Sequence, residues 1–281
     1  MLAAEFVRHL AARADGRLVQ RPKKEHALVL WWSSQRALVQ HAALSGLMAA
    51  FDGCWSATFA YDAGVGEFVD VTLARVPSGF DFSGPLQMLF EWVEKQGYVR
   101  PGHDGDLYGS LSADAWVGTS VELRGFTAGQ TVSYTRSWFG DAANDHATRL
   151  WPFVRTGGDG SMAALWLDGD RRTRVVHLGS GSGSLLTCVL AENGLDFLRL
   201  LAIGYREICW GEEFAAPPRP WGDSGKIVNG PYRDWLCGTF GVTVPETASE
   251  IVREPAEAGG PATGDAFCRW VEDHLDPPPV R

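Results

Sequence analysis

The run GSGSGS at residues 179–184 has the composition of a loop that could hold a phosphate group. Glycine-rich loops bind phosphate through their backbone N–H groups, and the familiar versions end in Gly-Lys-Ser/Thr or follow the spacing Gly-x-Gly-x-x-Gly. The run has neither feature, and its strict alternation also differs from the Gly-x-Ser-x-Gly turn of serine hydrolases. We therefore interpret it as a flexible connector between two strands, since glycine and serine runs are typical of linkers.

The loop PGHDGD is the best local candidate for a metal site, because His103, Asp104 and Asp106 lie close together on it. Calcium takes oxygen donors that alternate along a flexible loop containing glycine. This loop is shorter than a calcium-binding loop and lacks its terminal glutamate, so we expect a solvated loop and no metal ion.

A nucleophile and its base could come only from residues that are far apart in the chain. Cys54 and His41 would make such a pair if the fold brought them together. A buried thiol and an ordinary helix histidine are the simpler interpretation. The sequence therefore predicts no catalytic residue, no cofactor and no metal ion.

The charge of the chain limits the partners that it could bind. Its 281 residues include 34 acidic and 25 basic ones, which gives a net charge of -9 at pH 7. Proteins that bind nucleic acid neutralise phosphates with lysine and arginine, so this balance argues against a nucleic-acid partner. An acidic protein of this kind suits a basic protein partner.

The sequence also carries signals of location. No stretch reaches the roughly 18 uninterrupted apolar residues of a membrane span, and the first residues lack the apolar run of a signal peptide. The five cysteines are odd in number and widely spread, unlike a disulfide framework. We expect a cytoplasmic protein without membrane contact that is a monomer or a weak homodimer.

Twelve tryptophans are spread over the whole chain, a distribution typical of core packing rather than of a sugar-binding groove. Trp210 and Trp221 flank the stretch GEEFAAPPRP, so they are the two that we most expect to be exposed. Exposed tryptophan is common at protein-binding hot spots. Packing in the core is the alternative for both side chains.

Hydrophobic patterns in the first half predict both strands and helices. The expected strands are 27–32, Cys54–Tyr61, Phe68–Val76, Trp116–Leu123 and Gln130–Phe139, of which the second and third would form a hairpin. The expected helices are Leu2–Ala12, Arg36–Phe51 and the segment that begins at Pro85 and ends near Gly97. The Gly- and Asp-rich stretch Arg100–Asp114 suggests an internal boundary, and a long functional loop within one domain is the alternative.

The stretch from Gly157 to Gly204 predicts an antiparallel meander followed by a helix. Its expected strands are Met162–Leu167, Arg174–Leu178 and Leu185–Leu190. Asn193 can cap the following helix, which is apolar on almost all sides and should lie buried across the sheet. Farther on, PYRDWLCGTFG and the segment from Asp265 predict two more helices, and VTVPETASEIV is expected to be extended.

Several segments of this second half share a pattern with a known family. They are WPFVRTGGDGSMAALWLDGD, RVVHLGSGSG and LLTCVLAENGLDFLRLLAIG, followed by GTFGVTVPETASEIV and DAFCRWVEDHL. Over residues 150–275 the chain resembles the SUKH superfamily, which includes fungal cell-wall-synthesis regulators and many bacterial toxin-immunity proteins. The first half lacks the Leu-Pro step with which family members usually open.

The resemblance implies an α+β fold, in which helices pack on a mostly antiparallel sheet. We expect a SUKH-like region at residues 126–281. Residues 1–125 would form an N-terminal α+β region of uncertain affiliation, and a single continuous domain is the alternative.

The resemblance also implies a non-catalytic immunity protein that binds a cognate bacterial toxin and occludes its active site. The acidic composition favours a basic toxin such as a nuclease. Clusters of acidic residues and the two tryptophans indicate the candidate contact residues, which are Asp104, Asp106, Asp168, Asp170, Glu207, Trp210, Glu212, Glu213 and Trp221. The alternatives are an enzyme with a carbohydrate or nucleotide site in the N-terminal half and a regulatory scaffold protein.

Overall fold

The computed structural model of the chain describes residues 17–20, 28–32, 57–61, 66–82, 84–113, 119–219 and 229–275. Some features expected from the sequence lie outside these residues. They are the helices Leu2–Ala12 and Arg36–Phe51, the His41 and Cys54 pair, and Trp221.

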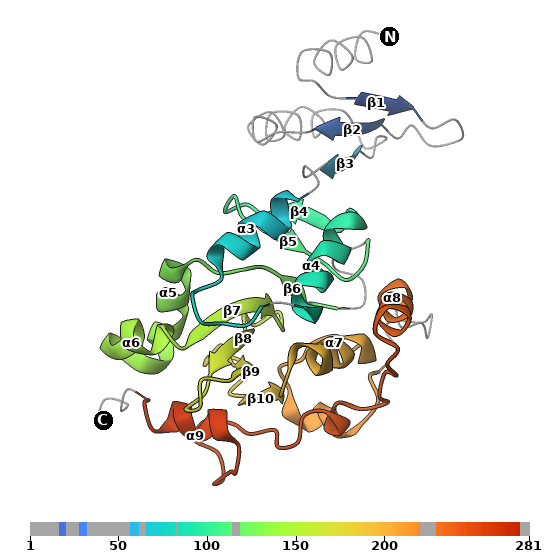
Figure 1. The fold of residues 1–281 in the computed structure, drawn as a ribbon. Helices are drawn as coiled ribbons and strands as arrows, with labels where there is room; N and C mark the ends of the chain where they lie inside the picture. The colour runs from blue at the N-terminus through green and yellow to red at the C-terminus, as the bar shows by residue number, and fades with distance from the viewer. Residues whose placement is uncertain are drawn as a thin grey trace.

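Three strands near the N-terminus form a small mixed sheet in the order β1-β2-β3 (Figure 1). β1 (Arg17–Gln20) and β2 (Leu28–Trp32) are antiparallel, whereas β2 and β3 (Ala57–Tyr61) are parallel. β2 confirms the strand expected in the apolar run at 27–32, and β3 confirms the end of the strand expected at Cys54–Tyr61. The expected hairpin is wrong, because β3 pairs with β2.

The segment expected to be the second strand of that hairpin is the helix α3 (Glu67–Arg75). Its buried side chains are Phe68, Val69 and Thr72, which follow helical spacing. The ring of Phe68 stacks on that of Phe90 in the next helix, with 5.2 Å between their centroids. Burial of one helical face therefore outweighs the β preference of the valines in this segment.

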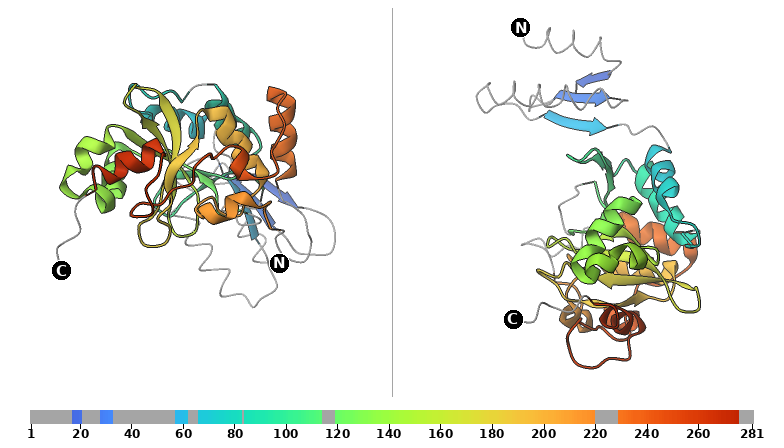
Figure 2. Two further views of the ribbon diagram at one scale, coloured as in Figure 1. Left: turned by 90° about the horizontal axis from the view of Figure 1, so that it is seen from below. Right: turned by 90° about the vertical axis from the view of Figure 1, so that its left-hand side faces the viewer.

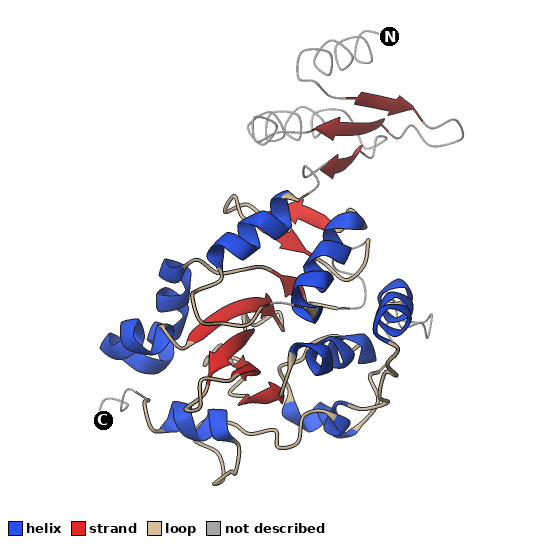
Figure 3. Cartoon of the chain, in the orientation of Figure 1, coloured by secondary structure: helices blue, strands red, loops and turns tan. Residues whose placement is uncertain are grey.

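Seven strands form the main sheet, in which each strand is antiparallel to its neighbours in the sequence (Figure 1, Figure 3). They are β4 (Val99–Pro101), β5 (Leu107–Gly109), β6 (Glu122–Leu123), β7 (Leu150–Arg155), β8 (Met162–Leu167), β9 (Thr173–Leu178) and β10 (Thr187–Ala191). This sheet and its helices confirm the expected α+β class. The stretch Arg100–Asp114 holds the β4–β5 hairpin, and the expected division after residue 125 falls between β6 and β7 of this one sheet.

Helices cover both faces of the main sheet, because its central strands are apolar on both sides (Figure 2). The helices on one face are α3, α4 (Pro85–Lys95), α7 (Gly194–Ile203) and α8 (Gly230–Phe240). Those on the other face are α5 (Ala128–Phe139), α6 (Ala143–Ala147) and α9 (Ala266–Glu272). On β8, Leu165 joins the first core and its neighbour Trp166 joins the second. A strand buried on both faces has a continuous apolar sequence, as β8 does.

The strand expected at Gln130–Phe139 is wrong, because these residues belong to the helix α5. The side chain of Thr127 accepts a hydrogen bond from the Gln130 N–H, and the Gln130 side chain accepts one from the Thr127 N–H. This reciprocal capping box starts the helix and outweighs the alternating pattern. Of the strand expected at Trp116–Leu123, the described part forms only the two residues of β6.

Most of the other expected elements are confirmed, with small shifts at their ends. β8, β9 and β10 form the expected meander, α4 begins at Pro85, and α8 and α9 are the two expected C-terminal helices. Asn193 caps α7, since its side chain accepts a hydrogen bond of 2.9 Å from the Asp196 N–H. The segment VTVPETASEIV forms no strand and contains the short 3-10 helix η4 (Ala248–Glu250), which corrects the expectation of an extended segment.

Candidate functional site

The serine-rich run at 179–184 is a turn that one carboxylate holds in place. Asp159 Oδ2 accepts hydrogen bonds from Ser161 Oγ at 2.7 Å, Ser180 Oγ at 2.9 Å and the Ser184 N–H at 2.9 Å. Burial acts to raise the pKa of Asp159, yet the hydrogen bonds from the serines lower it below its usual value. The expected flexible connector is therefore a fixed turn.

His177 is completely buried on β9. Its Nδ1 donates to the Leu186 carbonyl oxygen over 2.7 Å, which leaves Nε2 to accept from Thr156 Oγ1 over 2.9 Å. Burial lowers the pKa of His177 to about 4, so this imidazole is neutral near pH 7. With both nitrogen atoms bonded inside the protein, His177 connects β9 to its surroundings and is not placed to exchange protons with a substrate.

Arginines bind the two carboxylates of the β4–β5 loop. Asp106 pairs with Arg75 at 2.7 Å and with Arg124 at 3.1 Å, and Asp104 accepts from the Tyr108 hydroxyl at 2.5 Å. Burial acts to raise the pKa of both carboxyl groups, but hydrogen bonds and the nearby arginines lower both pKa values. These internal partners reduce the charge that Asp104 and Asp106 could offer to a toxin.

The turn between β8 and β9 uses its acidic residues in a similar way. Asp168 is buried, accepts from the backbone N–H groups of Asp170 and Arg172, and lies 3.4 Å from Arg174. Asp170 is exposed and pairs with Arg172 at 3.2 Å. Asp168 therefore shapes the turn, while Asp170 faces solvent.

Glu207 and Trp210 bond to each other. Glu207 Oε2 accepts from Trp210 Nε1 at 3.1 Å, and Glu207 Oε1 accepts from the Gly158 N–H at 2.9 Å. Burial acts to raise the pKa of Glu207, but these hydrogen bonds lower it. The half-buried Trp210 is thus tied to the loop that carries Gly158, and the pair holds two loops together.

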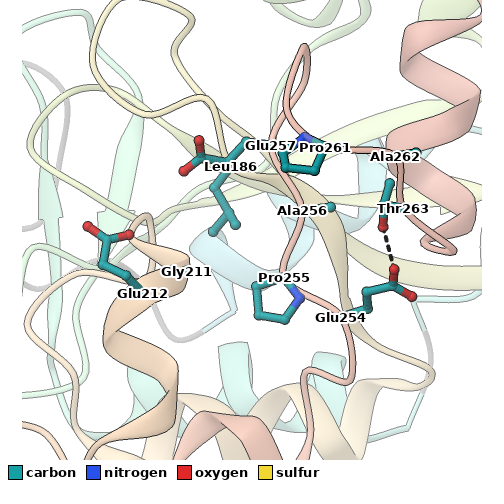
Figure 4. A pocket seen from close by; sticks show the side chains of 10 residues that line it. All are labelled: Leu186, Gly211, Glu212, Glu254, Pro255, Ala256, Glu257, Pro261, Ala262 and Thr263. Carbon is teal, nitrogen blue, oxygen red and sulfur yellow. Dashed lines mark hydrogen bonds between the residues drawn. The ribbon is translucent and has the colours of Figure 1, made fainter.

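A groove of about 480 Å³ lies between the 3-10 helix η2 (Gly211–Ala215) and the segment 254–264, which we call the groove strap (Figure 4). The floor and walls of the groove include the apolar side chains of Leu186, Pro255 and Pro261. Apolar lining of this kind gives a partner side chain a surface that it can bury.

Three carboxylates surround this groove. In Figure 4 those of Glu212 and Glu257 lie on one side and that of Glu254 lies on the other. Among the described residues that line the groove, none is basic. Glu213 is the exposed neighbour of Glu212 on η2. The groove therefore combines an apolar floor with a negative rim.

Backbone pairing attaches the groove strap to the last strand of the main sheet. The Thr187 N–H donates to the Ala256 carbonyl oxygen at 2.7 Å, and the Ala258 N–H donates to the Leu185 carbonyl oxygen at 3.1 Å. The strap thus continues the sheet beyond β10 and gives the groove a fixed wall.

Glu254 joins the two ends of the groove strap. Its Oε1 accepts from Thr263 Oγ1 and from the Gly264 N–H, each at 2.6 Å. These bonds lower the pKa of Glu254, with the Thr263 hydroxyl as the largest cause. Glu254 is consequently a structural part of the rim as well as a charge on it.

Glu212 and Glu213 are among the contact residues expected from the sequence, whereas Glu254 and Glu257 are not. Glu254 and Glu257 belong to the stretch EPAEAGGP, where proline, alanine and glycine surround the two glutamates and no cluster of acidic residues forms. The signal that could have found them is a pair of glutamates in a loop rich in proline and glycine, which predicts exposed carboxylates. Nothing in the local sequence indicates that this loop lies beside η2.

Across residues 66–82, 84–113, 119–219 and 229–275, no three or more His, Cys, Asp and Glu side chains are grouped so that they could hold a metal ion. In this same part of the chain, every helix is too short or too polar to cross a bilayer.

Comparisons of the chain with protein-family models, with curated proteins and with solved structures found no match. The likeness of residues 150–275 to the SUKH superfamily therefore stays a prediction.

Proposed function

We propose that this protein is a cytoplasmic, non-catalytic immunity protein of the SUKH type, which binds a cognate bacterial toxin through the acidic groove and occludes the toxin's active site. The observation that carries the proposal is the groove itself, with an apolar floor and a rim of Glu212, Glu254 and Glu257, and with no basic residue in the described part of its lining. The resemblance of the second half to immunity proteins agrees with this assignment.

The chemistry of the groove favours a basic partner. A lysine or arginine of the toxin would pair with Glu212 or Glu257, while the stem of that side chain would cover the exposed Pro255 and Pro261. Complementary charge accelerates association and selects the partner more than it adds affinity. Active sites of nucleases carry the positive charge that binds phosphate, so an acidic surface can cover such a site.

The groove would be the centre of a larger contact. A stable protein interface buries about 1,600 Å² in total, much more than one groove supplies. Glu213 and Leu185 lie beside the groove, and Leu185 exposes 43% of its surface. In the proposed complex, these two residues would extend the contact beyond the groove.

The first prediction tests this function by growth. The chain is co-expressed with the toxin-domain product of a neighbouring gene, and protection of the cells together with a one-to-one complex is expected. The double charge reversal Glu212→Lys, Glu257→Lys should weaken the complex by about a hundredfold or more, because two favourable charge pairs become repulsive. The dissociation constant is measured by calorimetry at fixed salt.

Glu91→Lys with Glu67→Lys is the matched control, since it changes the net charge equally on α4 and α3, away from the groove. The control should protect cells as the unmodified protein does. Equal weakening by both double variants would mean that overall charge, and not the groove, determines binding. A chain that binds no product of any neighbouring gene would contradict the immunity function.

A further inference from the structure

The two carboxylates on one side of the groove are both neighbours of Leu186. An isolated antiparallel bridge pairs Leu186 with Glu257, and directly opposite residues of such a pair carry their side chains on the same face. Gly211 begins η2 against the same leucine, because a Cβ atom there would lie 3.0 Å from Leu186 Cδ1. Glu212 follows Gly211, so Glu212 and Glu257 flank the same side of the apolar floor (Figure 4).

Glu254 offers one carboxylate oxygen on the opposite side of the groove. Its Oε1 is engaged by Thr263 and Gly264, whereas Oε2 accepts no hydrogen bond from the described residues. The positive charge of Arg269 lowers the pKa of Glu254 to a smaller extent than these bonds do. A cation from a partner can therefore approach Oε2 without displacing the bonds that close the strap.

No ion pair among the described residues neutralises the three carboxylates of the groove. The ion pairs in this part of the chain involve Asp104, Asp106, Glu122, Asp168, Asp170, Glu192 and Asp196. Glu212, Glu254 and Glu257 belong to none of these pairs, and all three are exposed. Like charges around one apolar floor repel one another, so the groove favours a partner that brings more than one positive charge.

The two sides of the groove favour different cations. A guanidinium group has five donors in a planar fork and can bond to two carboxylates at once, which suits the side with Glu212 and Glu257. An ammonium group is a compact point charge, and the single available oxygen of Glu254 can bind it without such a fork. The apolar stems of both cationic side chains can cover the exposed Pro255 and Pro261.

The spacing of the carboxylates fits alternate residues of an extended segment. Glu254 and Glu257 are three residues apart on the strap, so their Cα atoms are at most about 11 Å apart. Residues i and i+2 of an extended segment point to the same face about 7 Å apart, and the flexible stems of lysine and arginine bridge the difference. Adjacent residues point to opposite faces, so only one of them could enter the groove.

We infer that the groove recognises a dibasic extended segment of the toxin, in which an arginine reaches Glu212 and Glu257 and a lysine or arginine two residues away reaches Glu254. The inference rests on the proposed function for the identity of the partner. Recognition of the segment itself can be measured with short peptides and without a toxin.

Titration of the isotope-labelled full chain with acetylated and amidated pentapeptides, followed by NMR, tests this inference. The peptide Ala-Arg-Val-Lys-Ala should bind roughly threefold to fivefold more tightly than its isomer Ala-Arg-Lys-Val-Ala, as expected for one further exposed ion pair. The isomer has the same charge and composition, so long-range attraction to the acidic protein is equal for both. All titrations use the same low salt concentration, because screening weakens exposed ion pairs.

A third peptide, Ala-Lys-Val-Lys-Ala, tests the preference for arginine. It should bind roughly twofold or more weakly than Ala-Arg-Val-Lys-Ala, because an ammonium group lacks the fork that bonds to two carboxylates. Glu212→Gln should remove this preference, since one carboxylate remains on that side, and should keep the difference between the two isomers.

Glu254→Gln tests the other side of the groove. The amide keeps a carbonyl oxygen that can accept from Thr263 and Gly264, but the charge and the second carboxylate oxygen are lost. The ratio of the affinities of the two isomers should fall below about 1.5. Glu91→Gln on α4 removes the same charge at an exposed position away from the groove, so it should leave every ratio unchanged.

Equal binding of the two isomers by the unmodified protein would overturn the inference, because only the net charge of the peptide would then matter. A difference between the isomers that persists in Glu254→Gln would also overturn it. The peptides can discriminate as expected although no toxin binds, and a toxin can bind although the peptides do not discriminate. Failure of dibasic recognition and failure of the immunity function are therefore distinguishable.

Discussion

At the scale of single residues, carboxylates determine the conformation of loops whose composition suggests flexibility. Asp159 binds the serines of the run 179–184, and Asp265 both caps α9 and bonds to β10. Glu254 closes the groove strap. Each of these groups sits where several backbone N–H or hydroxyl donors converge, and bonds to a charged acceptor are stronger than bonds to a neutral one. The acidic residues of this protein are therefore partly structural.

The residue-scale prediction concerns Asp159→Asn. The amide replaces one acceptor oxygen by a donor, so some of the serine donors lose their partner. We expect the free energy of unfolding to fall by about 1–3 kcal/mol, as measured by urea denaturation. Asp170→Asn is the control, because its pair with Arg172 is exposed and should contribute less than about 1 kcal/mol. Similar losses in both variants would show that the turn does not depend on Asp159.

At the scale of elements, the contact between α4 and α7 requires a residue without a side chain at the start of α7. A Cβ atom at Gly194 would lie 2.8 Å from Cγ of the buried Leu86 on α4. This distance is shorter than a normal carbon contact, and close packing leaves Leu86 little room to move. The first turn of α7 can therefore approach α4 only because position 194 is glycine.

Gly194→Ala should destabilise the protein by about 1–2 kcal/mol, because overpacking costs more than the higher helix propensity of alanine adds. Thermal and urea unfolding measure the change. Gly238→Ala is the matched control, since it lies within α8 and no heavy atom is within 4 Å of a Cβ placed there. The control should gain up to about 1 kcal/mol. A gain in both variants would contradict the steric argument.

At the scale of the whole molecule, the main sheet is buried on both faces and encloses the titratable side chain of His177. The folded protein favours the neutral imidazole, and burial lowers its pKa to about 4 from an ordinary value of about 6.5. The unfolded chain therefore binds the proton more readily. Stability from this group is fully present above about pH 6.5 and is lost as the pH falls towards 4.

The unfolding free energy should fall by about 3 kcal/mol over this range of pH, at about 1.4 kcal/mol per unit for one proton. Urea denaturation at a series of pH values measures the slope. His177→Asn removes the titrating group, so its profile should be flatter over the same range even though the variant is less stable near pH 7. An unchanged slope in the variant would assign the acid sensitivity to other groups.

The local sequence predicts the correct helix or strand in some regions and the wrong one in others. The strands β8 to β10 and the helix α7 are predictable because continuous apolar runs alternate with turn residues and Asn193 supplies a cap. The alternation of apolar and polar residues in α5 predicts a strand, whereas the capping box at Thr127 starts a helix. The residues of α3 fit the spacing of a strand as well as that of a helix, and their packing on α4 favours the helix.

The sequence by itself determined the acidic balance of this protein, its α+β class and the order of elements after residue 157, because these follow from composition and from patterns within one segment. Only the tertiary structure decided which carboxylates face a common groove. Asp106 pairs with Arg75 and Arg124, which come from other segments of the chain. Glu212 and Glu257 also come from different segments, and both line the same groove. The reason is that the partners of a charged side chain come from distant segments, and packing of the whole sheet brings those segments together.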